Sequence, residues 1–263
     1  MELTKSKREI KTYKIEKTQR IHMLDEIRGL AVIAMILYHL FYSMTFIFNM
    51  ECSYSIMSAI YPYEPIIPIT FITISGIVCS FSRNNLKRGL IVFGVAIGIT
   101  LVTGIFIPSQ VILFGILHFL GIALILYGIL QKAFAKIPVG IGLTIFLILF
   151  IFCYNIPKGY IGISSYANIQ LPQQLYSVYA LSFIGFPSSD FISSDYFPII
   201  PYIFLFFAGT FIGRIFKEKG VPKFMYKKLC PPLDFIGKHA LIIYVTHQPI
   251  IIAVLYVLNM VEF

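Results

Sequence analysis

Three histidines lie within long apolar stretches of the chain: His39, His118 and His247. An ionisable side chain at membrane depth costs free energy unless it has a partner or a task. Imidazole can accept or relay protons near neutral pH, although it can also form plain hydrogen bonds between helices. Three such residues in one short chain, with Gln248 beside one of them, indicate a buried polar centre.

The spacing of the histidines from nearby cations estimates their depth. His39 follows Arg28 by eleven residues, which is about 16 Å along a helix at 1.5 Å per residue. His247 follows Lys238 by nine residues, so both are expected near the middle of a bilayer. His118 is expected seven residues inside the outer end of its helix.

Hydroxyl groups accompany the first histidine. Tyr42 and Ser43 follow His39 at i+3 and i+4, so they share its helical face. A hydroxyl there could fix the imidazole tautomer, and simple packing is the alternative.

A short polar segment, Ser82–Gly89, carries three cations and two amides. Arg83, Asn84, Lys87 and Arg88 could together bind phosphate groups. The alternative is that the basic residues only mark the cytoplasmic side of a membrane protein.

The composition places these residues in a membrane protein. Of the 263 residues, 58% are hydrophobic and 13% charged, and the mean hydropathy is +0.84. Soluble domains carry about 25% charge. Charge-free stretches of membrane-spanning length predict an all-α bundle of about seven transmembrane helices. The predicted helices are 29–49, 66–82, 88–106, 111–131, 137–155, 198–215 and 238–258.

The basic residues predict the orientation. In this topology every Lys and Arg except Lys158 falls on one side, which the positive-inside rule assigns to the cytoplasm. We therefore expect a cytoplasmic N-terminus and an outer C-terminus in the cell membrane. The net charge of +9 then reflects orientation and not nucleic-acid binding.

The predicted organisation is a basic arm, 1–20, followed by one transmembrane domain, 21–263. Segment 156–197 is an outer loop, in which the apolar stretch 174–186 lies on the membrane or dips into it. This outer face is rich in Tyr, Ser, Asn and Gln, with few charges such as Asp195. It could receive a sugar, or form an ordinary interfacial belt.

Several segments resemble a known family. They are Leu24–Ala31 with His39 after it, Phe71–Gly76, Ser82–Gly89, Phe114–Gly121, Asp195–Pro198 and His247–Pro249. In order and spacing, over roughly 20–258, they resemble the bacterial branch of the heparan-alpha-glucosaminide N-acetyltransferase catalytic-domain family. That family is related to membrane acyltransferases that modify cell-surface glycans.

The resemblance implies an acyl-CoA-dependent enzyme that moves an acetyl group from cytoplasmic acetyl-CoA to a sugar amine or hydroxyl outside. It implies His39 as general base or acyl carrier, with His118 and His247 as further catalytic residues. Arg28, Arg83, Asn84, Lys87 and Arg88 would hold the CoA phosphates. The expected substrate-binding residues are Tyr42, Ser43, Asp195, Tyr196 and Gln248.

Other functions stay open at this stage. A proton-coupled transporter or flippase could use the histidines as a relay, and a non-catalytic membrane subunit would need none of them. No metal is expected, because no metal-ligand spacing is visible. The expected partners are the bilayer, acyl-CoA and a glycan acceptor, with homo-oligomerisation left open.

Overall fold

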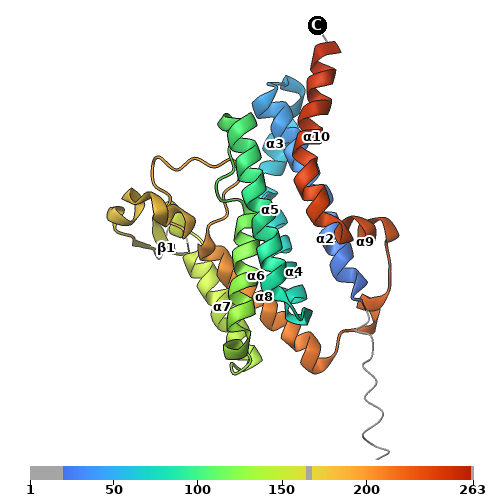
Figure 1. Ribbon diagram of the computed structural model, residues 1–263, viewed down its shortest axis with the longest axis vertical. Coiled ribbons are helices and arrows are strands. Elements are labelled where there is room, and N and C mark those ends of the chain that lie inside the picture. Colours follow the sequence, from blue (N-terminus) through green and yellow to red (C-terminus); the bar gives the residue numbers. More distant parts are fainter. Residues whose placement is uncertain (1–19, 164–167, 262–263) are drawn as a thin grey trace, which may run out of the picture.

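The structure is a computed structural model that describes residues 20–163 and 168–261. All of the predicted arm except Arg20 therefore lies outside the described residues. The long elements are helical (Figure 1). They are α2 (His22–Tyr42), which continues as a π-helical turn (Ser43–Ile47), α3 (Glu51–Ile60), α4 (Ile66–Phe81), α5 (Asn85–Phe106), α6 (Ile116–Phe134), α7 (Val139–Cys153), α8 (Ile199–Lys219), α9 (Pro231–Lys238) and α10 (Ala240–Val261).

The predicted transmembrane helical bundle is confirmed. Among the described residues, six helices are individually long and apolar enough to cross a membrane. A seventh span arises if α3 and α4, which meet at a bend of 42°, are taken as one broken span. The α4–α5, α6–α7 and α8–α9 connections lie toward the same end of the bundle, the lower end in Figure 1.

Several predicted boundaries were wrong because the prediction ended helices at charged residues. The first helix begins at His22, not at residue 29, because the charges in its first turns have partners. Asp25 binds Arg20 and Arg28, at 2.6 and 3.1 Å. Glu26 accepts a hydrogen bond from the Cys230 N–H at 2.8 Å. Two helices, α3 and α9, lie where loops were expected.

The helix predicted from residue 111 begins at Ile116. His118 therefore lies in its first turn and not seven residues inside it. Chain segments 111–114 and 193–197 run side by side before this helix, joined by the Ser194 N–H to the Val111 carbonyl at 2.9 Å and the Phe197 N–H to the Phe114 carbonyl at 3.0 Å. This pairing brings the end of the outer segment to the start of α6.

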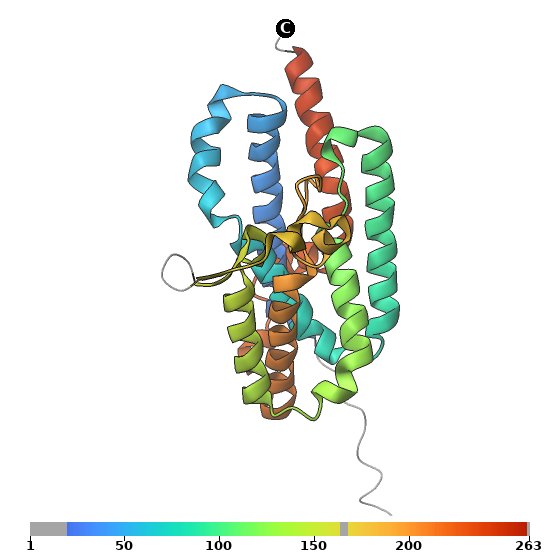
Figure 2. The same ribbon diagram turned by 90° about the vertical axis from the view of Figure 1, so that its left-hand side faces the viewer.

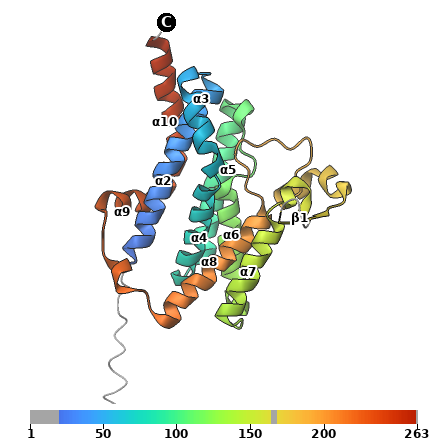
Figure 3. The same ribbon diagram turned by 180° about the vertical axis from the view of Figure 1, so that it is seen from behind.

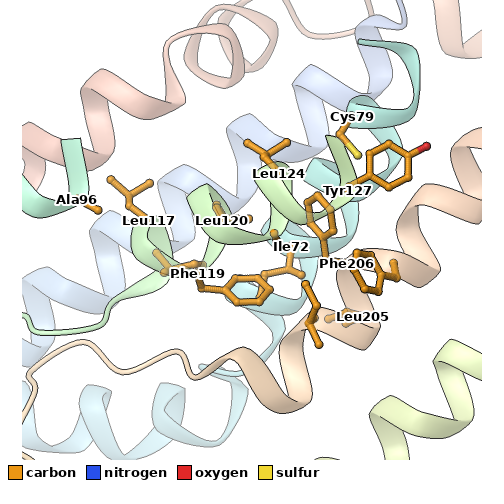
Figure 4. Close-up of a cluster of buried hydrophobic side chains, with 14 of the residues drawn as sticks. Ile72, Cys79, Ala96, Leu117, Phe119, Leu120, Leu124, Tyr127, Leu205 and Phe206 are labelled. Carbon is orange, nitrogen blue, oxygen red and sulfur yellow. The ribbon is translucent and has the colours of Figure 1, made fainter. Parts of the chain in front are cut away.

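The hydrophobic core lies where α4, α6 and α8 meet. Ile72, Phe119 and Phe206, one from each helix, are fully buried, and Figure 4 shows the cluster around them. Glycines let α4 and α8 approach closely, because a Cβ on Gly76 or Gly209 would lie within 2.5 Å of a backbone carbonyl oxygen of the other helix. Small residues at a helix crossing are a usual feature of membrane bundles.

The described part of segment 156–197, which the sequence predicted to lie outside, is largely irregular. It holds a two-stranded antiparallel sheet, β1 (Tyr160–Gly162) with β2 (Asn168–Gln170), and short 3-10 turns such as Ile156–Lys158, Gln173–Ser177 and Tyr179–Phe183. In Figure 2 these elements face the viewer, across the bundle. Stretch 174–186 lies in the last two turns and forms no spanning helix.

Helix α9 lies against the N-terminal half of α2 (Figure 3). The contact is tight, since a Cβ on Gly237 would lie 1.8 Å from the Asp25 carbonyl oxygen. Buried Asp234 anchors α9 through Lys238 at 2.6 Å, His22 at 2.7 Å and Lys228 at 3.2 Å. Burial alone would raise the pKa of Asp234, but these three partners outweigh it and hold that pKa below its usual range.

Candidate functional site

One large cavity of about 1370 Å³ runs through the bundle. Its walls come from α2, α4, α5, α6 and α10, and from residues 194–197 of the outer segment. Small-molecule pockets usually measure about 300–1,000 Å³. This cavity therefore has room for more than one ligand.

Two of the three predicted histidines line this cavity and meet across it. His39 on α2 and His247 on α10 have ring centroids 4.9 Å apart, with planes tilted by 46°. The His39 side chain forms no hydrogen bond with any described residue, and its ring nitrogens are not among the enclosed atoms. Its ring is therefore free to contact a ligand.

The hydrogen bonds of His247 define its tautomer. Its Nδ1 lies 2.6 Å from the Tyr244 carbonyl oxygen, a partner that can only accept. Nδ1 therefore carries the hydrogen, and in the neutral ring Nε2 carries a lone pair. Nε2 is enclosed and has no hydrogen-bond partner among the described residues. This lone pair is therefore available to accept a hydrogen bond from a ligand or from another side chain.

Gln248 and Ser43 link the same two helices. The Gln248 amide donates to Ser43 Oγ at 3.0 Å, and Ser43 is fully buried. Tyr42 lines the cavity beside them. Ser43, which the sequence placed near His39, and Gln248, which follows His247, thus fasten α2 to α10 at the level of the histidine pair.

The third histidine does not line the cavity. The Gly115 N–H donates to His118 Nδ1 at 3.2 Å, so the hydrogen is on Nε2, which lies 3.1 Å from Thr100 Oγ1. Thr100 in turn donates to the Ile112 carbonyl at 2.6 Å. With both nitrogens satisfied, the geometry of His118 fits a cap that fixes the start of α6.

One end of the cavity is basic. Arg28, Arg88 and Lys238 line it, from α2, α5 and the end of α9. The other predicted phosphate-binding residues, Arg83, Asn84 and Lys87, are exposed and lie outside the lining. Asn84 has a local task, because its side chain accepts the Lys87 N–H at 3.1 Å and caps α5.

The cavity lining also holds polar and acidic groups, from Glu64, Asp195 and Tyr196. The Asp195 Oδ2 accepts from the Ile116 N–H at 3.0 Å and from the Tyr244 hydroxyl at 2.9 Å. Burial, the largest influence, raises the pKa of Asp195 although both hydrogen bonds favour the carboxylate. Tyr196 donates to the Ser182 carbonyl at 2.6 Å.

Lys238, Glu64 and Tyr244 are among the lining residues that sequence reasoning did not assign to the site. Lys238 was used only to estimate the depth of His247. Its position directly before an apolar run was a signal that it could lie at the basic end of the cavity. Glu64 is a lone acid between prolines, and Tyr244 lies three residues before His247, on the same helical face. Within 20–163 and 168–261, no group of three or more His, Cys, Asp or Glu side chains is placed to hold a metal ion.

Comparison with known families identifies the chain. The family model "Heparan-alpha-glucosaminide N-acetyltransferase, catalytic" matches residues 20–249. The chain therefore belongs to this family, whose membership implies a membrane acetyltransferase. No curated protein and no solved structure gave a significant match.

Proposed function

We propose that this member of the family transfers an acetyl group from acetyl-CoA, bound from the cytoplasm, to a sugar amine or hydroxyl on the outer side. The observation that carries the proposal is the single cavity whose lining combines the cations Arg28, Arg88 and Lys238 with the His39–His247 pair and polar groups such as Asp195. The transporter alternative gains no such support, because the family is one of transferases.

The basic end suits the donor. Arg28, Arg88 and Lys238 would bind the CoA phosphates, since guanidinium and ammonium groups form strong charge-assisted hydrogen bonds with phosphate. The eleven residues from Arg28 to His39 provide about 16 Å along α2 for an extended pantetheine arm. The thioester would then lie near the histidine pair.

His39 acts as the general base. The acceptor nitrogen or oxygen attacks the thioester carbonyl carbon and forms the new amide or ester bond, while the proton passes to His39. The carbon–sulfur bond breaks, and the departing CoA thiolate takes a proton from the His39 imidazolium. General-base catalysis of this type contributes about 10²–10⁴-fold in rate.

His247 supports the base as a positioning residue. Its Nε2 lone pair faces no other described donor, so it can accept a hydrogen bond from His39 once that ring is protonated. An acceptor that is oriented in advance stabilises charge that develops during the reaction.

Purified protein in proteoliposomes tests the proposal. Acetyl-CoA is added outside, glucosamine is enclosed in the lumen, and CoA thiol release and lumenal acetyl-glucosamine are measured. The proposal predicts acceptor-dependent CoA release that His39→Ala abolishes. Equal activity of wild type and His39→Ala, or no binding of acetyl-CoA, would refute it.

A further inference from the structure

The helices around the cavity form a horseshoe and not a closed ring. Helix α10 packs on α2, α2 on α4, α4 on α6, and α6 on α5. The two ends of this series, α5 and α10, are not a packed pair, although the structure describes both helices (Figure 1). The wall of the cavity is therefore interrupted between α5 and α10.

On each of these two helices, the residues that line the cavity recur every three or four positions and form one stripe along the gap. The apolar members include Ile91, Val95 and Val102 on α5, and Leu241, Ile252 and Tyr256 on α10. Ile91, Val102 and Tyr256 are 53%, 56% and 60% exposed while they also line the cavity. The cavity thus reaches the outer surface of the bundle along a slot between α5 and α10.

This slot opens toward hydrocarbon. Both helices are long and apolar enough to cross a membrane. A Cβ built on Gly98, which lines the cavity, meets nothing within 4 Å. From the level of His247 the α10 stripe runs about 9 Å to Leu241 and about 14 Å to Tyr256, at 1.5 Å per residue. The longer run is close to half of the ~30 Å hydrocarbon core, so most of one leaflet's chain fits along it.

We propose that this slot binds the hydrocarbon chain of a lipid-anchored acceptor, whose sugar headgroup reaches the histidine pair. The inference rests on the proposed function and specifies its acceptor. The slot is continuous with the site, because Tyr244 and Gln248 belong both to its α10 stripe and to the surroundings of His247. The basic end admits the donor, and the lateral slot admits the acceptor's chain from the bilayer.

Alkyl glucosaminides of increasing chain length, tested in nanodiscs, measure the contribution of the chain. For wild type, kcat/KM should rise with chain length from methyl to dodecyl, by up to about fourfold per buried methylene, the equivalent of ~0.8 kcal/mol. Equal kcat/KM for methyl and dodecyl acceptors would overturn the assignment of a lipid-anchored acceptor.

Two neighbouring glycines on α5 provide a matched pair of variants. Gly98→Phe fills the slot, whereas Gly94→Phe places the same side chain in equally open space outside the cavity lining. Partition of the alkyl acceptors into the bilayer raises kcat/KM equally for both variants. Gly94→Phe should behave as wild type. Gly98→Phe should keep transfer to the methyl acceptor and lose the part of the chain-length dependence by which wild type and Gly94→Phe exceed it. Ala253→Phe and Val254→Phe repeat the comparison on α10. Of these two residues, Ala253 lines the cavity and Val254 does not.

Photolabelling separates the slot from the chemistry, because it needs no turnover. The probe is dodecyl glucosaminide with a diazirine in its chain. We expect labelled peptides from α5 and α10 in wild type and Gly94→Phe, and their loss in Gly98→Phe. Unchanged labelling in Gly98→Phe would overturn the slot. If no acceptor received an acetyl group, the proposed function would be refuted. The labelling result would still show whether the slot binds the alkyl chain.

Discussion

A double-mutant cycle on His39 and His247 tests whether the two rings act as one unit. In the proposed reaction His247 accepts a charge-assisted hydrogen bond from protonated His39, an interaction worth about 1.5–3 kcal/mol. At 1.36 kcal/mol per tenfold, His247→Phe should lower the turnover number by about 10- to 150-fold. His39→Ala should lower it by about 10²–10⁴-fold, as loss of a general base does.

The decisive result is the double variant. Since His247 acts only through His39, His39→Ala with His247→Phe should be no slower than His39→Ala alone. The assay is CoA thiol release at saturating acetyl-CoA, normalised to folded protein. Multiplied losses in the double variant would refute the coupling, because they would show two independent contributions.

Stability separates loss of function from loss of fold. His247→Phe removes one hydrogen bond, worth about 0.5–1.5 kcal/mol. The free energy of unfolding should therefore fall by no more than about 1.5 kcal/mol, and the variant should stay folded. The chain contains no tryptophan, but buried Cys79 permits a melting assay with a thiol-reactive dye.

Four further outcomes follow from the packing and the charges. His118→Phe should lower the free energy of unfolding by about 1–3 kcal/mol, through the donors and acceptors left unpaired, while folded protein keeps its turnover number. Arg88→Gln should raise the KM for acetyl-CoA about tenfold or more, by loss of a charged hydrogen bond, and Arg83→Gln, at a residue outside the cavity lining, should change it far less. Gly237→Ala should cost about 1–3 kcal/mol in a melting assay, because its Cβ has no room beside α2. Asp234 has a lowered pKa, so it stabilises the fold above the unfolded value of about 3.9, and this stability is lost as pH falls further. Wild type should therefore lose thermal stability below about pH 4, whereas Asp234→Asn should be less stable at neutral pH and should not show this loss.

The sequence predicted the helices well where hydropathy alone determines them, as in α5 and α7. It failed where tertiary partners neutralise charges. Asp25 and Glu26 lie inside α2 because Arg20, Arg28 and the Cys230 N–H bind them, and no one-dimensional pattern reveals those partners.

The site was predictable in its residue types and not in its grouping. Depth along a helix placed His39 and His247 alike, and the structure brings their rings together. The same reasoning could not separate His118, because the position of its helix start depends on pairing with the distant segment 193–197. The sequence also could not show which cations line the cavity. Helix packing determines this, and it places Arg88 in the lining but not Arg83.

The most direct test of the account is an experimental density map of the protein with a thioether analogue of acetyl-CoA that cannot transfer its acyl group. The account predicts phosphates at Arg28 and Arg88, and the acyl carbonyl within hydrogen-bonding reach of His39, with His247 behind it. An analogue bound at the exposed Arg83–Lys87 turn, with its acyl group outside the cavity, would contradict it.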